Sequence, residues 1–542
     1  MSAGEKVIVV GGGLAGSEAA WQLAVRGVEV ELCEMRPELT TPAHISGELA
    51  ELVCSNSLRS REITVAAGLL KEELTRLGSL LIAEAHKYAL PAGGALAVDR
   101  KRFSRHITKL LSEHPKIKLI RQEVVELPDS CPVIIASGPL TSDRLSAVIK
   151  ELLGERYLYF YDAISPTVTA KSINLGKTFQ ASRYDKGAPG YINCPLTEQE
   201  YELFYRALLK AESYPRHQFE LDKFFEGCLP IEELARREKE AMRFGPLKPV
   251  GLVDPKSNQR PYAVVQLRPE DRDCSLYNLV GFQTRLRMND QREIFSLIPA
   301  LAEAEFVRLG SAHRNTYINS PHHLERSLKL KGRDNIWFAG QLVGTEGYCE
   351  SIAMGLIAGL NVYQTLKGKN IISPPPATML GSLLKYITTV SEEVFQPMNS
   401  SFGLLPAMDK KMENKLAKKE ELAKRALNDL GKMIAESGMT IQLFARPSRP
   451  SKPHPERPAR QVSKSSAKHP PKQIPGGKEE KPARTSEPSP PTHSRQQGTI
   501  ERRGGGQRRY QSDRQSRTGK RGDESGKSKD KDKSSGSDKP AS

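Results

Sequence analysis

The chain has 542 residues and a formal net charge of +17, and 38% of its residues are hydrophobic. This length exceeds one ordinary core and predicts two folded units plus accessory sequence. The seven cysteines are odd in number and scattered, which argues against a disulfide framework and a paired zinc site, and no apolar run reaches membrane-spanning length. We therefore expect a cytoplasmic location, no metal and no membrane partner. The charge favours a polyanionic partner, although a solvated basic tail with no specific partner explains it equally well.

The first predicted element is the apolar, β-branched run KVIVV at residues 6–10, which is typical of a buried parallel strand. The glycine-rich turn GGGLAG follows it and opens an amphipathic helix, so that Gly11, Gly13 and Gly16 form a GxGxxG pattern between strand and helix. In this context the pattern predicts a dinucleotide site, where the pyrophosphate meets the helix N-terminus. The predicted contacts from the turn are Gly11, Gly12, Gly13, Leu14, Ala15 and Gly16.

The next strand, VEVELCE, ends at Glu34. A carboxylate at this spacing accepts hydrogen bonds from ribose hydroxyls and disfavours a 2′-phosphate, so the bound adenosine belongs to FAD or NAD rather than NADP. A site for S-adenosylmethionine is less favoured, because the third glycine stands where dinucleotide folds need it.

Cys54 stands in a polar run, AELVCSNSLRS, at residues 50–60. Cysteine is usually a small buried hydrophobe, and these surroundings are more typical of a reactive thiol. Cys228 precedes a predicted helix with Pro230 at its first position. The helix dipole favours a thiolate at Cys228 and the carboxylates of the first turn oppose it, so the direction of its pKa stays open. We expect Cys33, Cys131, Cys194 and Cys274 to be packing residues. Packing is also favoured for Cys349, with a place beside the flavin as the alternative, because its helix should point at the cofactor.

Two later segments favour FAD over NAD. Residues 335–361 read as an apolar strand, a glycine-rich loop and a helix with small residues on one face, and CPVIIASGPL at 131–140 reads as a strand and turn of the same sheet. The predicted fold is α/β, a glutathione-reductase-type FAD-binding Rossmann domain with an inserted α+β domain. The predicted parts are 1–165 and 306–445 for the FAD-binding domain and its closing helices, 166–305 for the insertion, and 446–542 for a disordered basic tail.

Six stretches together resemble one known family: AELVCSNSLRS, PAGGALAVDR, FEGCLPIEELA, RFGPLKPVGL, HRNTYINSP and FAGQLVGTEGYCES. The chain resembles the folate-dependent tRNA uracil-5 methyltransferases, the TrmFO family, which are related to the GidA/MnmG flavoproteins. The resemblance implies bound FAD, a one-carbon unit from 5,10-methylenetetrahydrofolate, electrons from NADH or NADPH, and methylation of uridine 54 in the T-loop of tRNA.

The family's two cysteines correspond to Cys54 and Cys228. One adds to carbon 6 of the uracil, and the other assists; we favour Cys228 as the nucleophile and leave the assignment open. The resemblance extends the FAD contacts to Gly340, Gln341 and Gly347, and Tyr348 is our own candidate for stacking on the folate pterin, with ordinary packing as the alternative.

Candidate basic stretches for tRNA are residues 235–244, 284–292 and 415–433, the last a mixed-charge surface helix. The tail is expected to add nonspecific RNA affinity. The competing functions are a GidA/MnmG-type modifier of wobble uridine, a non-catalytic RNA-binding flavoprotein, and a small-molecule flavin oxidoreductase.

Overall fold

The computed structural model describes residues 6–41, 43–154, 158–185, 190–214, 229–390, 395–408 and 412–444, all within one compact unit, Met1–Pro458. The predicted tail, residues 446–542, lies outside the described residues, and so does Cys228. Among the described residues, no helix combines the length and apolar character needed to cross a membrane.

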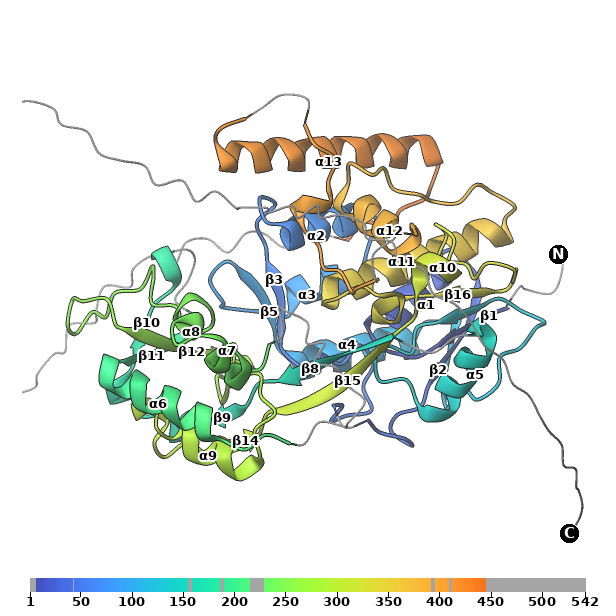
Figure 1. Cartoon of the computed structure of the whole chain (residues 1–542). Coiled ribbons are helices and arrows are strands. Elements are labelled where there is room, and N and C mark those ends of the chain that lie inside the picture. The colour runs from blue at the N-terminus through green and yellow to red at the C-terminus, as the bar shows by residue number, and fades with distance from the viewer. Residues whose placement is uncertain are drawn as a thin grey trace, which may run out of the picture. The chain divides into compact units, whose positions relative to one another are not determined.

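A five-stranded parallel sheet forms the centre of the FAD-type domain (Figure 1). Its order is β16–β7–β1–β2–β6, so the first strand lies in the middle and the strand from the distant closing segment lies at one edge. The predicted strand at residues 6–10 is confirmed, and three of its five side chains are buried, as a parallel strand covered on both faces requires. The strands are β1 (Lys6–Val10), β2 (Glu29–Glu34), β6 (Ile117–Arg121), β7 (Val133–Ile135) and β16 (Ile336–Phe338).

Helices α1 (Leu14–Ala24) and α11 (Tyr348–Leu366) pack closely because α11 presents glycines to α1. A Cβ on Gly355 would lie 2.2 Å from the Ala15 carbonyl oxygen, and one on Gly359 would lie 2.9 Å from that of Ala19. The predicted small-residue face of the closing helix is therefore confirmed. This contact joins segments more than 300 residues apart and brings the N-termini of both helices to one end of the sheet.

Other helices and a small sheet surround the parallel sheet. The predicted surface helix near residue 415 is confirmed as α13, and it buries an apolar face that includes Leu422, Ala426 and Leu430. The small sheet has the order β3–β5–β4, with β3 (Ser57–Ser60), β4 (Ala89–Leu90) and β5 (Ala95–Val98). The helices are α2 (Ala66–Arg76), α3 (Leu80–Lys87), α4 (Arg100–Ser112), α5 (Asp143–Leu153), α10 (Ser320–His323), α12 (Met379–Thr388) and α13 (Lys415–Ser437), with a 3-10 turn η7 (Phe402–Leu404).

The second sheet has six strands in the order β10–β11–β12–β13–β9–β14, and its pairs are antiparallel. Its strands are β9 (Thr167–Thr169), β10 (Phe179–Gln180), β11 (Ile192–Leu196), β12 (Ala263–Pro269), β13 (Leu276–Leu279) and β14 (Phe306–Arg308). Its helices are α6 (Glu198–Lys210), α7 (Ile231–Arg237), α8 (Ala241–Phe244) and α9 (Met288–Phe295), and its 3-10 turns include η1 (Ala170–Ser172), η2 (Leu175–Lys177), η3 (Arg183–Asp185) and η5 (Pro299–Leu301).

A two-stranded ribbon, β8 (Leu158–Ile164) paired with β15 (Ser311–Tyr317), flanks this second sheet in sequence on both sides. Each of the two large sheets has its own hydrophobic cluster. One surrounds the parallel strands, and the other surrounds β11, β12 and helix α6. The predicted domain boundaries at 165 and 305 lie near the ends of these strands and stay predictions.

Candidate functional site

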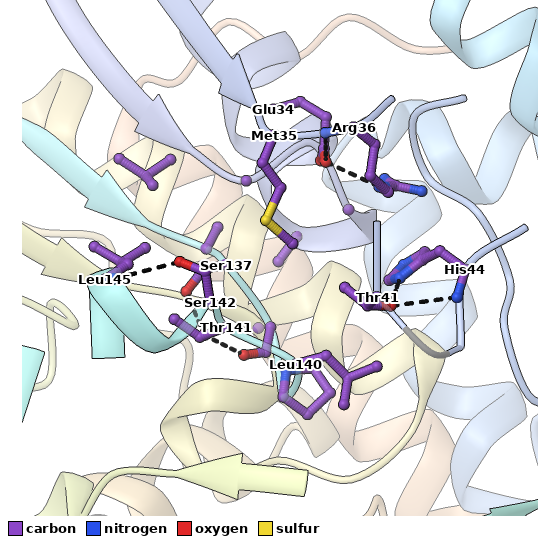
Figure 2. Close-up of a pocket in the computed structure, with 18 of the residues that line it drawn as sticks. Glu34, Met35, Arg36, Thr41, His44, Ser137, Leu140, Thr141, Ser142 and Leu145 are labelled. Atoms are coloured by element: carbon purple, nitrogen blue, oxygen red, sulfur yellow. Dashed lines mark hydrogen bonds and ion pairs between the residues drawn. The ribbon is translucent and has the colours of Figure 1, made fainter. Parts of the chain in front are cut away.

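A cavity opens at the carboxyl ends of the parallel strands, where α/β folds of this type bind ligands. About 1000 Å³ of space not filled by atoms lies between the turns that follow β1, β2, β7 and β16, part of it open to solvent. Figure 2 shows Glu34, Arg36 and His44 on different sides of this space from Ser137, Thr141 and Leu145. Of the predicted contacts, the cavity is lined by Gly11, Gly13, Leu14, Ala15, Glu34, Gly340, Gln341 and Tyr348.

The glycine-rich turn has the geometry that a dinucleotide site requires. Gly11 has φ +100°, and a Cβ there would lie 2.6 Å from the Ala136 carbonyl oxygen. A Cβ on Gly16 would lie 1.8 Å from the Gly11 carbonyl oxygen, so this glycine allows the helix to meet the strand. A Cβ on Gly13, by contrast, meets no atom within 4 Å. Because Gly13 also caps α1 without a side-chain hydrogen bond, the turn leaves a helix N-terminus and open space for an anionic group.

Glu34 joins the turn to the end of β2. Its Oε2 accepts a hydrogen bond from the Gly12 amide at 2.8 Å, and its Oε1 accepts from the Nε of Arg36 at 2.9 Å. Burial acts to raise the pKa of Glu34, but the hydrogen bonds and positive charge of Arg36 outweigh it, so the pKa is lowered. The carboxylate therefore stays ionised, and Oε2 keeps a lone pair for a ribose hydroxyl. Gly12 and Gly16 support the turn from behind and do not line the cavity.

Other side chains of the cavity escaped the sequence analysis. Thr41 and His44 are joined by a 2.6 Å contact between Oγ1 and Nδ1, and Ser137 and Thr141 by a 2.7 Å contact between their hydroxyls. Burial, with the nearby charge of Arg36, lowers the pKa of His44 to about 4, so its ring is neutral at pH 7. The serine could have been found, because it follows β7 at the carboxyl edge of the sheet, but the loop carrying Thr41 and His44 has no such signal.

The closing segment supplies the second turn into the cavity. Gly340 begins a 3-10 turn, η6 (Gly340–Val343), and has φ +79°. It lies against Ala15, because a Cβ on Gly340 would be 2.8 Å from the Ala15 Cβ. The Nε2 of Gln341 donates to Glu346 at 2.7 Å. Gly347 caps α11 beside Glu350 and does not line the cavity.

Tyr348, the first residue of α11, connects the cavity to Cys54. Its hydroxyl oxygen accepts hydrogen bonds from the amides of Cys54 and Ser55, at 2.9 and 3.2 Å, and lies 2.9 Å from the Cys54 Sγ. The two amides occupy both lone pairs of the oxygen, so the O–H is left to donate to the sulfur. Burial and the nearby Cys54 raise the pKa of Tyr348, which therefore keeps this proton. A phenol aimed at the sulfur stabilises its thiolate form.

Arginines from three elements hold the loop that carries Cys54. The buried Arg268 of β12 donates from Nε to the Asn56 Oδ1 at 2.6 Å and from Nη2 to the Ser55 Oγ at 2.8 Å. Arg308 of β14 donates to the Val53 carbonyl at 2.8 Å. Arg100 of α4 donates to the Leu52 carbonyl at 3.1 Å, and its other Nη lies 2.5 Å from Glu270. The second sheet and helix α4 together thus hold the loop that carries the thiol.

The other cysteines divide into two groups. Cys33, Cys194 and Cys349 are buried, as predicted, and burial raises the pKa of each, to about 11 for Cys33 and Cys349. Cys349 faces Leu58 and Lys71 in the core rather than the cavity. The prediction was wrong for Cys274, which is exposed in the turn between β12 and β13. Cys131 is only half-buried.

The helix after Cys228 is confirmed as α7, although Pro230 is its cap rather than its first residue. The carboxylate of Glu232 in its first turn accepts hydrogen bonds from Thr284 and from the Arg285 amide. Two predicted basic stretches are largely engaged within the protein. Arg285 is buried, and its guanidinium lies 2.9 Å from the Glu233 carboxylate. Arg236 lies 2.7 Å from the same carboxylate, and Arg287 lies 2.6 Å from the carboxylate of Glu212.

Comparison with known proteins agrees with this geometry. The family described as "Glucose inhibited division protein A" matches residues 6–370. Proteins from Brevibacillus brevis and Persephonella marina are 53% and 55% identical to the chain, over 78% of its length and 97% and 98% of theirs. Both are named "Methylenetetrahydrofolate--tRNA-(uracil-5-)-methyltransferase TrmFO", as is an Aquifex aeolicus protein at 55% identity. The chain belongs to the TrmFO family.

Two solved structures share the fold of this TrmFO chain. Two crystal forms of Aquifex aeolicus GidA superpose with a TM-score of 0.57, at 16% and 17% identity, covering 79% and 80% of this chain and 73% and 78% of theirs. At so low an identity the superposition is evidence for the fold alone, and this shared fold confirms the predicted FAD-type α/β architecture. The TrmFO relatives, by contrast, are matched over nearly their whole length.

Proposed function

We propose that this chain methylates uridine 54 in the T-loop of tRNA to 5-methyluridine, with 5,10-methylenetetrahydrofolate as the one-carbon donor. Membership of the TrmFO family supports the reaction class. The observation that carries the proposal is the Cys54 sulfur, held by the Tyr348 hydroxyl at the edge of a dinucleotide cavity. A thiol with a phenol donor beside a redox-cofactor site suits a reaction that needs both thiolate chemistry and electrons.

The residues of the cavity fit FAD. The open space at Gly13 and the uncapped N-terminus of α1 suit a pyrophosphate, and the Glu34 carboxylate suits ribose hydroxyls. When bound and reduced by NADH or NADPH, FAD supplies the two electrons that convert the folate methylene into a methyl group.

The thiols then have separate tasks. Carbon 5 of uracil becomes nucleophilic when a thiolate adds to carbon 6, and we assign this addition to Cys228. After the one-carbon unit joins carbon 5, the proton on that carbon must leave, and we assign its removal to the Cys54 thiolate. The Tyr348 hydroxyl orients the Cys54 sulfur and favours its thiolate form, and loss of the carbon 5 proton lets Cys228 depart. Uridine and methylenetetrahydrofolate, with two electrons and two protons from NAD(P)H and solvent, thus give 5-methyluridine and tetrahydrofolate.

The test uses the purified full-length protein and an unmodified tRNA transcript. Product that depends on methylenetetrahydrofolate and NAD(P)H, without S-adenosylmethionine, and that maps to uridine 54 by nuclease mass spectrometry is the expected result. A transcript with uridine 54 replaced by cytidine is the control. FAD-loaded protein that is reduced normally but makes no 5-methyluridine would overturn the proposal and favour a non-catalytic RNA-binding flavoprotein.

Single substitutions separate the two thiols. Cys228→Ser should abolish formation of a covalent complex with tRNA containing 5-fluorouridine at position 54, because that complex requires addition at carbon 6. Cys54→Ser should still form the covalent complex with the 5-fluorouridine tRNA, but it should not methylate tRNA with ordinary uridine at position 54. Full methylation by Cys54→Ser would remove Cys54 from the mechanism. The cytoplasmic location stays a prediction.

A further inference from the structure

A basic surface lies at the β10 edge of the second sheet. Figure 1 shows β10 on the opposite side of the picture from β1 and β2, the strands whose following turns line the dinucleotide cavity. Residues 175–184 and 244–260 together contain five basic residues and one acidic residue. We call it the Tyr184 surface and define it by its exposed members Lys177, Tyr184, Lys248, Lys256 and Arg260. None of the five lines the cavity described above.

The four cations of the Tyr184 surface form no ion pair with any residue that the structure describes. They differ in this from the predicted basic stretches, where Arg236, Arg285 and Arg287 face carboxylates. The Nζ of Lys256 donates only to the Gly176 carbonyl, at 2.7 Å, which joins the two segments beside Lys177. Asp254, the one acidic residue of the two segments, accepts from the Lys256 amide at 2.9 Å and forms no ion pair with the four cations. Exposed cations without ion pairs repel one another and are best neutralised by a polyanion.

Tyr184 adds an aromatic ring to this surface. The residue is 61% exposed and has φ 56°, a left-handed conformation that a bulky side chain rarely adopts. Its amide donates to the Gly251 carbonyl at 2.9 Å, and a Cβ on Gly251 would lie 2.9 Å from two ring carbons. Glycine at 251 therefore lets the ring lie against the backbone while its other side faces solvent. A strained backbone conformation that leaves an aromatic ring largely exposed is a feature that clusters at binding sites.

The surface is connected to the thiol along one face of β12. Arg183, next to Tyr184, donates to the Gln266 side chain at 3.1 Å, and Arg268, two residues further along β12, holds Ser55 and Asn56. Side chains two apart on a strand point to the same face. Arg183 therefore contacts the face of the sheet that meets the Cys54 loop, and Tyr184 follows Arg183 directly in the chain.

We propose that the Tyr184 surface binds the RNA substrate, with the Tyr184 ring stacked on an unpaired base and the four cations against phosphates. Every base has a π face, and an aromatic ring beside cations is a common platform for unpaired nucleotides. The cations come from two segments and do not converge in a pocket, which suits an extended polyanion better than a small anion such as a folate tail. This inference rests on the proposed function and names the surface that holds its RNA.

The experiment measures binding of fluorescent, unmodified tRNA transcript to the full-length, FAD-loaded protein by anisotropy, without folate or NAD(P)H. Tyr184→Ala should weaken binding about tenfold, and Tyr184→Phe, which keeps the ring, should bind like the wild type. Lys248→Ala/Lys256→Ala should reduce the slope of log affinity against log salt by roughly one to two.

Lys367→Ala/Lys369→Ala is the matched control. Both lysines are exposed and lie just beyond the C-terminal end of α11, a helix of about 28 Å that begins at Tyr348. This control should bind like the wild type. Wild-type affinity and salt slope in both the Tyr184→Ala and the Lys248→Ala/Lys256→Ala proteins, or equal losses in the control, would overturn the proposal. Because no methylation is needed, a wild-type protein that binds RNA through this surface but makes no product would refute the proposed function alone.

Discussion

Replacing Tyr348 by phenylalanine removes one oxygen atom and tests the link between the cavity and Cys54. The hydroxyl lies 2.9 Å from the Cys54 Sγ and accepts from the amides of Cys54 and Ser55. A hydrogen bond to a charged group contributes about 1.5–3 kcal/mol. Its loss in Tyr348→Phe should lower the thiolate population of Cys54 at least about tenfold at pH 7. The two amides lose their acceptor, which should cost about 1–3 kcal/mol of unfolding free energy.

The assay for Tyr348→Phe is the rate of alkylation of Cys54 by iodoacetamide, which attacks the thiolate. Peptide mass spectrometry reads Cys54 and the exposed Cys274 in the same digest, so Cys274 serves as an internal reference. The ratio of the two rates should fall at least about tenfold. Tyr317→Phe is the matched control, because its buried hydroxyl bonds to the Phe395 carbonyl at 3.2 Å. An unchanged ratio in Tyr348→Phe would refute the assignment of the O–H to the sulfur.

Three further substitutions test other parts of the structure. Gly13→Ala should fold normally, since a Cβ there meets no atom within 4 Å, yet lose FAD, seen as a drop in flavin absorbance with the thermal stability of the FAD-free wild type. Arg268→Met should lower the unfolding free energy by about 2–4 kcal/mol in urea titration and reduce kcat more than KM, because Ser55 and Asn56 lose charged donors. Glu73 accepts the first amides of α12, and burial raises its pKa from 4.5 to about 8. Its stabilising contribution is therefore present below pH 4.5 and lost as the pH rises to about 8, so Glu73→Gln should flatten the unfolding free energy between these values; an unchanged pH profile would contradict this.

The sequence predicted much of the parallel-sheet domain, because its signals are local. The apolar run at residues 6–10, the glycines that follow and Glu34 stand in an order that one folding unit explains. The glycines of α11 could likewise be understood, since only a helix packed against another backbone needs small residues at 355 and 359. Packing failed as a guide for Cys274, because its neighbours in sequence do not reveal that the turn at 274 faces solvent.

Partnerships between distant residues could not be predicted. The sequence left Tyr348 as a candidate either for stacking on the folate pterin or for ordinary packing, whereas its hydroxyl meets Cys54, a residue 294 positions away. The contacts of Arg268 with Ser55 and Asn56 span more than 200 positions. The positions of basic residues in the sequence also did not distinguish the predicted basic stretches from the Tyr184 surface. The sequence does not show which of these residues lie beside a carboxylate in the folded protein.

The sequence by itself thus determined the dinucleotide turn, the acidic end of the second strand and the presence of two unusual cysteines. These features follow from backbone sterics and residue chemistry over short spans, so they depend only on residues that are close together in the sequence. Only the tertiary structure decided which donor faces the Cys54 sulfur, which arginines hold its loop and which cations remain unpaired. Such choices depend on side chains that meet across the fold, where position in space, rather than in the chain, sets the strength of hydrogen bonds and charges.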